Sequence, residues 1–135
     1  MDMIFERKLP IPMEAKKMYP LSPALAEIVE ARGAELRDII SGRSEKLLLL
    51  IGPCSADNED SVLEYITRLK RVQERVKERI FMVPRIYTNK PRTTGSGYKG
   101  MLHQPDPEKK PDMFKGIVAI RSMHIRALKE TGFSC

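Results

Sequence analysis

The sequence lacks any long apolar run. Its longest, Leu47 to Ile51, has five residues, whereas a membrane-spanning helix needs about 18 or more. The opening stretch MDMIFERKLPIPM carries charges, where a secretory signal needs an unbroken apolar core of about 7 to 15 residues. These two absences predict a cytoplasmic protein that has no membrane partner.

Cysteine is also scarce. Cys54 and Cys135 are the only two, and their wide separation matches neither a disulfide framework nor the close cysteine pairs of a zinc site. This usage fits a reducing compartment. With 135 residues, of which 41% are apolar and 31% charged, the chain has the composition of an ordinary globular domain.

Acidic residues are absent between positions 80 and 104, and this gap accounts for most of the net charge of +6. Glycine, proline and threonine are interleaved there with four cations, while the first 79 residues carry equal numbers of cations and acids. A local excess of this kind favours a compact anion site over a broad nucleic-acid surface. We therefore expect no nucleic-acid partner.

The first half of the chain predicts an arm, a helix and a strand. Residues 1–21 contain several prolines and no sustained periodicity, which predicts an extended arm. Ser22 followed by proline is a typical helix start, and Gly42 is a typical helix stop. The run LLLLI at 47–51 is apolar on both sides, which predicts a strand buried in a parallel sheet.

The second half continues the alternation. A long amphipathic helix is expected after Asp57 or Asn58, and a second strand is expected at IFMV, residues 80–83. A third helix is expected between Asp112 and Gly132. Strands that alternate with helices indicate parallel βα units, which place functional loops at the carboxyl ends of the strands.

Two loops, 52–58 and 85–104, are expected at that end of the sheet. Cys54 in the first loop is either a packed, inert thiol or a metal ligand or nucleophile. The second loop is either solvated or a phosphate pocket, because arginine offers a planar fork, lysine a point charge and threonine a hydroxyl. His103 and His124 are interpreted as a loop residue and a helix-surface residue.

The motif LLLLIGPCS, followed by PRIYTNKPRTTGSGYKG and then GMLHQPDP, resembles the amino-terminal third of 3-deoxy-7-phosphoheptulonate synthase in its type I, barrel-only form. The resemblance extends from about residue 24 to 135, and the small GSG before Tyr98 departs from it locally. It implies an α/β fold: the amino-terminal part of a (β/α)8 TIM barrel, about two βα units, preceded by an extended arm and one helix. The implied division is an extension at 1–46 and an incomplete barrel domain at 47–135.

The resemblance also implies chemistry. This family condenses phosphoenolpyruvate with erythrose 4-phosphate, which opens the shikimate pathway to chorismate and the aromatic amino acids. By the match, Cys54 is a ligand of a divalent metal, with manganese, iron, cobalt and zinc all compatible. Lys90 is the candidate catalytic proton donor. The implied substrate-binding residues are Arg85, Lys90, Pro91, Arg92 and Thr93.

The other metal ligands of the family come from later strands. We therefore expect that this chain does not hold the metal by itself, and that it is a truncated, inactive form of the synthase. The alternative is a non-catalytic fragment that binds to, or oligomerises with, a full-length synthase. Assembly into a homo-oligomer is left open.

Overall fold

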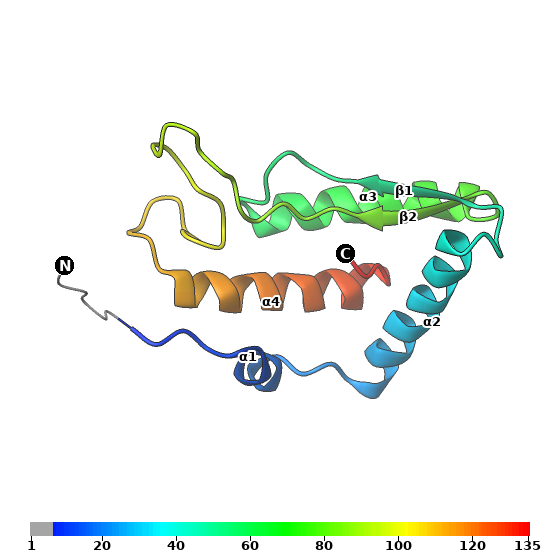
Figure 1. Ribbon diagram of the computed structural model, residues 1–135, viewed down its shortest axis with the longest axis horizontal. Helices are drawn as coiled ribbons and strands as arrows, with labels where there is room; N and C mark the ends of the chain where they lie inside the picture. Colours follow the sequence, from blue (N-terminus) through cyan, green and yellow to red (C-terminus); the bar gives the residue numbers. More distant parts are fainter. Residues whose placement is uncertain (1–6) are drawn as a thin grey trace.

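The structure is a computed structural model that describes residues 7–135. Its elements follow one another as α1 (Pro12–Met18), α2 (Pro23–Ile40), β1 (Leu47–Ile51), α3 (Glu59–Val76), β2 (Ile80–Pro84) and α4 (Met113–Thr131) (Figure 1). The two strands are parallel neighbours, in register from Leu47 opposite Ile80 to Ile51 opposite Pro84. In the described part of the chain, no helix is long and apolar enough to cross a membrane.

Helices α2, α3 and α4 each begin after a residue whose side chain caps the helix. Ser22, Asn58 and Asp112 each accept a hydrogen bond from the backbone N–H three residues later, at 3.3, 2.9 and 3.0 Å. These bonds satisfy N–H groups that have no partner within the helix. Gly132 ends α4 with a φ of 76°, a left-handed conformation that glycine adopts without strain. The predicted starts and the stop of these helices are confirmed.

The hydrophobic core lies between α3, β2 and α4. Ile66 of α3 and Met123 of α4 are fully buried at its centre. Burial of a side chain of this size contributes about 1.5–3 kcal/mol. The other buried members of the core are Ala56, Val62, Leu63, Leu69, Met82, Met101, Ala127 and Phe133. Helix α4 therefore packs on α3 rather than standing alone (Figure 1).

The arm is not wholly extended, so that prediction is wrong for Pro12–Met18, which form α1. Proline suits the first helical turn, and the Glu14 carboxylate accepts a hydrogen bond from the Ile11 N–H at 2.9 Å. The seven-residue helix buries only Ala15, packing against α4, and is too short to show a helical period. Two helices therefore precede β1; residues 1–6 lie outside the described residues.

Strand β1 is less buried than its sequence predicts. Leu49 and Ile51 pack against the core, but Leu47 and Leu50 are 62% and 65% exposed. Apolar residues on both faces were expected to be covered, and that expectation is wrong. Successive side chains of a strand point to opposite faces, so Leu50 lies on the face opposite to that of Leu49 and Ile51, which face the core.

The outer edge of β2, in contrast, is closed by side chains. The Gln73 amide of α3 donates to the Ile80 carbonyl at 2.8 Å and accepts from the Met82 N–H at 2.7 Å. Arg32 of α2 donates to the Met82 carbonyl at 2.6 Å, and Pro84 has no N–H to offer. Side chains thus satisfy backbone groups that an added strand would otherwise pair with.

Candidate functional site

Two loops begin at the carboxyl end of the sheet, one after each strand (Figure 1). We call residues 52–58 the first loop and residues 85–104 the second loop. A backbone hydrogen bond joins them, from the Ala56 N–H to the Tyr87 carbonyl (2.9 Å), and the second loop begins beside the end of β1, where the Arg85 N–H donates to the Ile51 carbonyl (2.8 Å). Parallel strands thus bring together two segments that are far apart in the sequence.

Gly52 allows the closest approach between the loops. A β-carbon at this position would lie 2.8 Å from the carbonyl carbon of Arg85 and closer still to its oxygen. Two residues further on, the exposed Cys54 thiol meets the second loop, because the Lys90 ammonium donates to its sulfur at 3.7 Å. The structure therefore places Cys54 beside Lys90, as the loop positions predict, while their chemical roles stay predictions.

Arg85 is anchored at the boundary of the two loops. Its Nη1 donates to the Pro53 carbonyl at 3.2 Å, and its guanidinium lies over the Tyr87 ring, 4.3 Å from the centroid. An exposed cation–π contact contributes about 0.5–1 kcal/mol. A guanidinium has five N–H donors, so this anchoring leaves donors for an anion.

Arg92 and Thr93 lie on the exposed tip of the second loop. The tip is closed by the Lys90 N–H, which donates to the Lys99 carbonyl at 2.9 Å. The Arg92 Nε donates to the Tyr98 carbonyl at 2.8 Å, which fixes its side chain against its own loop. No hydrogen bond among the described residues links Arg92 or Thr93 to Cys54, and their binding roles stay predictions. Pro91, between Lys90 and Arg92, is exposed as well.

Two buried polar atoms lie in these loops without a hydrogen-bond partner among the described residues. They are the hydroxyls of Ser55 and Tyr98. Burial, and after it the negative charge of Asp57, raises the pKa of Tyr98, so its hydroxyl stays a donor at neutral pH. Buried hydroxyls of this kind are normally paired, and a bound polar group would pair them. The GPCS motif contains Ser55, but nothing in the sequence signals that its hydroxyl is buried.

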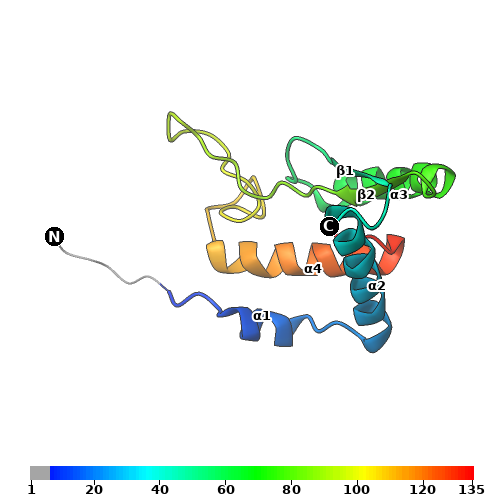
Figure 2. The same ribbon diagram turned by 45° about the vertical axis from the view of Figure 1, so that its right-hand side comes forward.

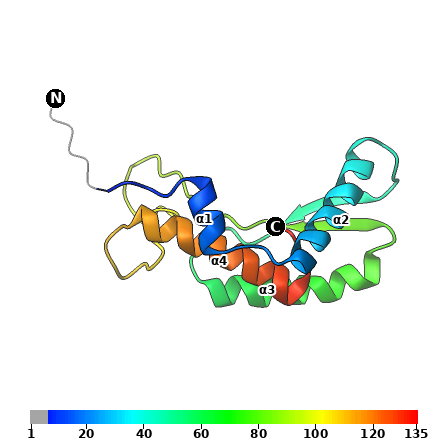
Figure 3. The ribbon, with the colours of Figure 1, turned by 90° about the horizontal axis from the view of Figure 1, so that it is seen from below.

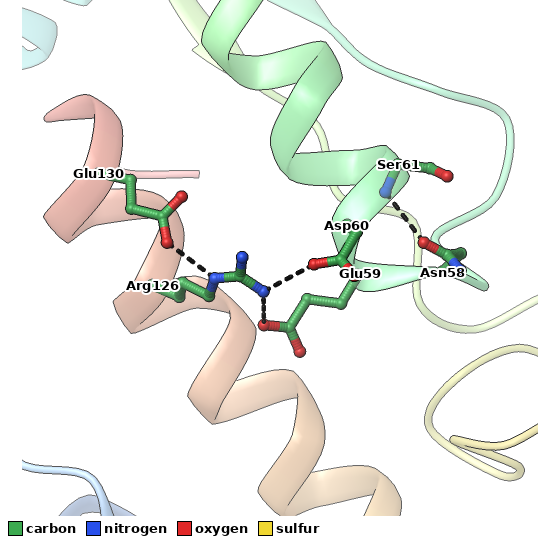
Figure 4. Close-up of polar contacts among 6 residues, drawn as sticks. All are labelled: Asn58, Glu59, Asp60, Ser61, Arg126 and Glu130. Carbon is green, nitrogen blue, oxygen red and sulfur yellow. Dashed lines mark hydrogen bonds and ion pairs between the residues drawn. The ribbon is translucent and has the colours of Figure 1, made fainter.

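The residues that directly follow the first loop are joined to α4 by hydrogen bonds. Arg126 of α4 donates to Glu59 and Asp60, at the start of α3, at 2.9 Å each, and to Glu130 at 2.7 Å (Figure 4). The hydrogen bonds to Glu130, Glu59 and Asp60, in that order, raise the pKa of Arg126. Exposed ion pairs add little stability, but this network fixes the end of the first loop relative to α4.

The described residues do not form a metal site. No group of three or more histidine, cysteine, aspartate or glutamate side chains is arranged to hold a metal ion within residues 7–135. A catalytic zinc, for example, takes three protein ligands, and Cys54 can supply only one. The role of Cys54 as a metal ligand therefore stays a prediction.

Comparison with solved structures supports the fold. The structure of phospho-2-dehydro-3-deoxyheptonate aldolase from Francisella tularensis matches with a TM-score of 0.87 at 26% sequence identity. The match covers 98% of this chain and 38% of that chain. The arrangement of α1, α2 and the two βα units, seen from two further directions in Figures 2 and 3, is therefore one that this aldolase shares.

Comparison with known sequences identifies the family. The DAHP synthetase I family matches residues 11–117. The Tyr-sensitive phospho-2-dehydro-3-deoxyheptonate aldolase of Salmonella typhimurium is 37% identical over 87% of this chain and 33% of its own length. The Haemophilus influenzae aldolase is 38% identical over 70% of this chain and 26% of its own length. This chain spans about a third of the relatives it matches, and it belongs to the DAHP synthetase I family.

Proposed function

We propose that the chain supplies part of the active site of a 3-deoxy-7-phosphoheptulonate synthase, and that its two βα units are the first two of a barrel. The reaction joins phosphoenolpyruvate to erythrose 4-phosphate and releases phosphate, as the first step toward chorismate and the aromatic amino acids. The observation that carries the proposal is the contact of Lys90 with Cys54. It unites the first loop with the cationic second loop, which contains no acid, in a chain of this family.

Each cation has a proposed task. Arg85 and Lys90 bind phosphoenolpyruvate, and Lys90 also donates a proton to the alkoxide that develops on the sugar. Arg92 and Thr93 bind the phosphate of erythrose 4-phosphate. Pro91 stiffens the backbone between Lys90 and Arg92. Two multiply charged anions held side by side need several cations. Full alignment of two reactants lowers a barrier by about 7–11 kcal/mol.

The first test is activity of the 135-residue chain. Since Cys54 provides a single metal ligand within the described residues, we expect negligible turnover from the chain alone. Purified protein is assayed for phosphate release with both substrates and manganese. Release at ordinary enzyme rates would contradict this part of the proposal and would mean that the missing ligands come from elsewhere, such as a partner polypeptide.

Lys90→Met should weaken the binding of phosphoenolpyruvate. Loss of a hydrogen bond to a charged group costs about 1.5–3 kcal/mol, which corresponds to a rise in Kd of roughly 10- to 100-fold. Calorimetric titration of the full chain measures the change. Lys70→Met is the matched control, because Lys70 is exposed on α3. Equal affinities of the Lys90 and Lys70 variants for phosphoenolpyruvate would show that Lys90 does not bind this substrate.

The second candidate function is a non-catalytic fragment that binds a full-length synthase. The exposed Leu47 and Leu50 favour it, because an apolar strand with an open edge is a pairing surface. Gel filtration of the chain with and without a full-length synthase distinguishes the two functions. A true partner moves into the larger species, whereas a chain that elutes unchanged does not support this candidate.

A further inference from the structure

A second site is suggested by a cleft of about 450 Å³ between α1 and α4. Helix α1 lies on the side of α4 that faces away from the sheet (Figures 1 and 2), so the cleft is remote from the two loops. Its walls are largely apolar and include Pro12, Ile117 and Ile120. A volume of this size falls within the range of about 300–1,000 Å³ that is common for small-molecule sites.

The polar side chains of the cleft are basic. Lys16 of α1 and Arg121 and His124 of α4 line it, and no aspartate or glutamate does. The Arg121 Nε donates to the Tyr19 carbonyl at 3.1 Å, which ties the arm to α4 and leaves four guanidinium N–H donors. No ion pair to Arg121 is found in the described part of the chain.

His124 is half-buried rather than on the helix surface, so that interpretation is corrected. Burial, and after it the charge of Arg121, lowers the pKa of His124 from its ordinary value of 6.5. The imidazole is therefore neutral at pH 7 and can donate one N–H. It does not add to the charge of the cleft, which rests on Lys16 and Arg121.

Arg121 and His124 also line a smaller cavity, of about 190 Å³, in which Leu21, Val29 and other largely apolar residues form the walls and no acid is present. Arg121, partly exposed, thus lines two largely apolar hollows, and a cation in such surroundings is more favourable with an anion beside it. The acid of α1, Glu14, accepts a hydrogen bond from the Ile11 N–H at the start of that helix.

We propose that the cleft between α1 and α4 binds a small organic monoanion, with a compact hydrocarbon body against Ile117 and Ile120 and its carboxylate on Arg121 and Lys16. A phosphate dianion would be harder to desolvate among these apolar walls. A zwitterion would bring an ammonium group for which the cleft has no acidic partner. This site is independent of the proposed synthase function.

The test uses the full chain labelled with ¹⁵N and titrated with cyclohexanecarboxylate, with cyclohexanecarboxamide as a neutral analogue of similar shape. We expect saturable amide shifts at residues 12–16 and 117–124, and a Kd for the carboxamide that is about tenfold higher. Arg121→Gln should weaken carboxylate binding by about tenfold and leave carboxamide binding nearly unchanged.

Since Arg121 also holds the arm, a second variant keeps the test independent of folding. Lys16→Gln should weaken carboxylate binding by about two- to fivefold, as expected for a partly screened charge. Lys17→Gln is the matched control, because Lys17 is also exposed but does not line the cleft. Equal affinity for acid and amide, shifts confined to the two loops, or equal effects of the two lysine variants would overturn the proposal.

Discussion

Replacing Gly52 by alanine is expected to destabilise the protein by about 1–3 kcal/mol, the usual cost of overpacking. The new methyl group would overlap the backbone of Arg85, with its carbonyl carbon at 2.8 Å, and a backbone cannot rotate out of the way as a side chain can. The first loop must then move away from the second, and Cys54 from Lys90. Urea unfolding measures the loss of stability.

Gly33→Ala is the matched control for this substitution. Gly33 lies within α2, and a β-carbon there would meet only the end of the Arg37 side chain at 3.5 Å, an ordinary contact. Alanine in the interior of a helix is favoured over glycine by about 0.5–1 kcal/mol, so this variant should be more stable than the natural chain. If both variants were equally stable, the close approach at Gly52 would have no energetic importance.

Gly116→Ala is expected to be destabilising although it lies inside a helix. The gain in helix propensity is about 1 kcal/mol, but the methyl group would lie 2.6 Å from the Leu102 carbonyl carbon, closer to its oxygen, and 2.7 Å from the Met101 carbonyl oxygen. These are backbone atoms of the second loop, so we expect overpacking of about 1–3 kcal/mol to outweigh the gain.

Thermal and urea unfolding of the Gly116 and Gly33 variants determine whether each substitution stabilises or destabilises the protein. We expect the midpoint to fall for Gly116→Ala and to rise for Gly33→Ala. Both glycines lie within helices, and they differ in the atoms that an added β-carbon would meet. A rise in both midpoints would show that the second loop moves at little energetic cost and that its contact with α4 does not fix its position.

Local chemistry made much of the fold predictable from the sequence. The caps at Ser22 and Asp112 and the stop at Gly132 act through neighbouring residues, so their patterns can be recognised without the rest of the structure. Helix α1 was missed because seven residues carry no period. The exposure of Leu47 and Leu50 was missed because burial depends on what covers a strand, and the strand's own composition does not reveal this.

The candidate site was predictable to a similar extent. Parallel βα topology places the carboxyl ends of neighbouring strands side by side, and this explains why Cys54 and Lys90 could be expected to meet. The attachment of Arg92 to the Tyr98 carbonyl and the buried hydroxyl of Ser55 depend on how the second loop folds back. Loop conformations of this kind are set by tertiary contacts, which no local pattern shows.

The central claim, that the two loops meet at Cys54 and Lys90, is tested most directly with o-phthalaldehyde. This reagent forms a fluorescent isoindole only where a thiol and a primary amine are adjacent. Burial raises the pKa of the competing Cys135 thiol to about 11, so that thiol reacts slowly near neutral pH. Peptide mapping should find Cys54 linked to Lys90, with no product in Cys54→Ser or Lys90→Met. Linkage of Cys54 to a different lysine, or no linkage in the natural chain, would contradict the account.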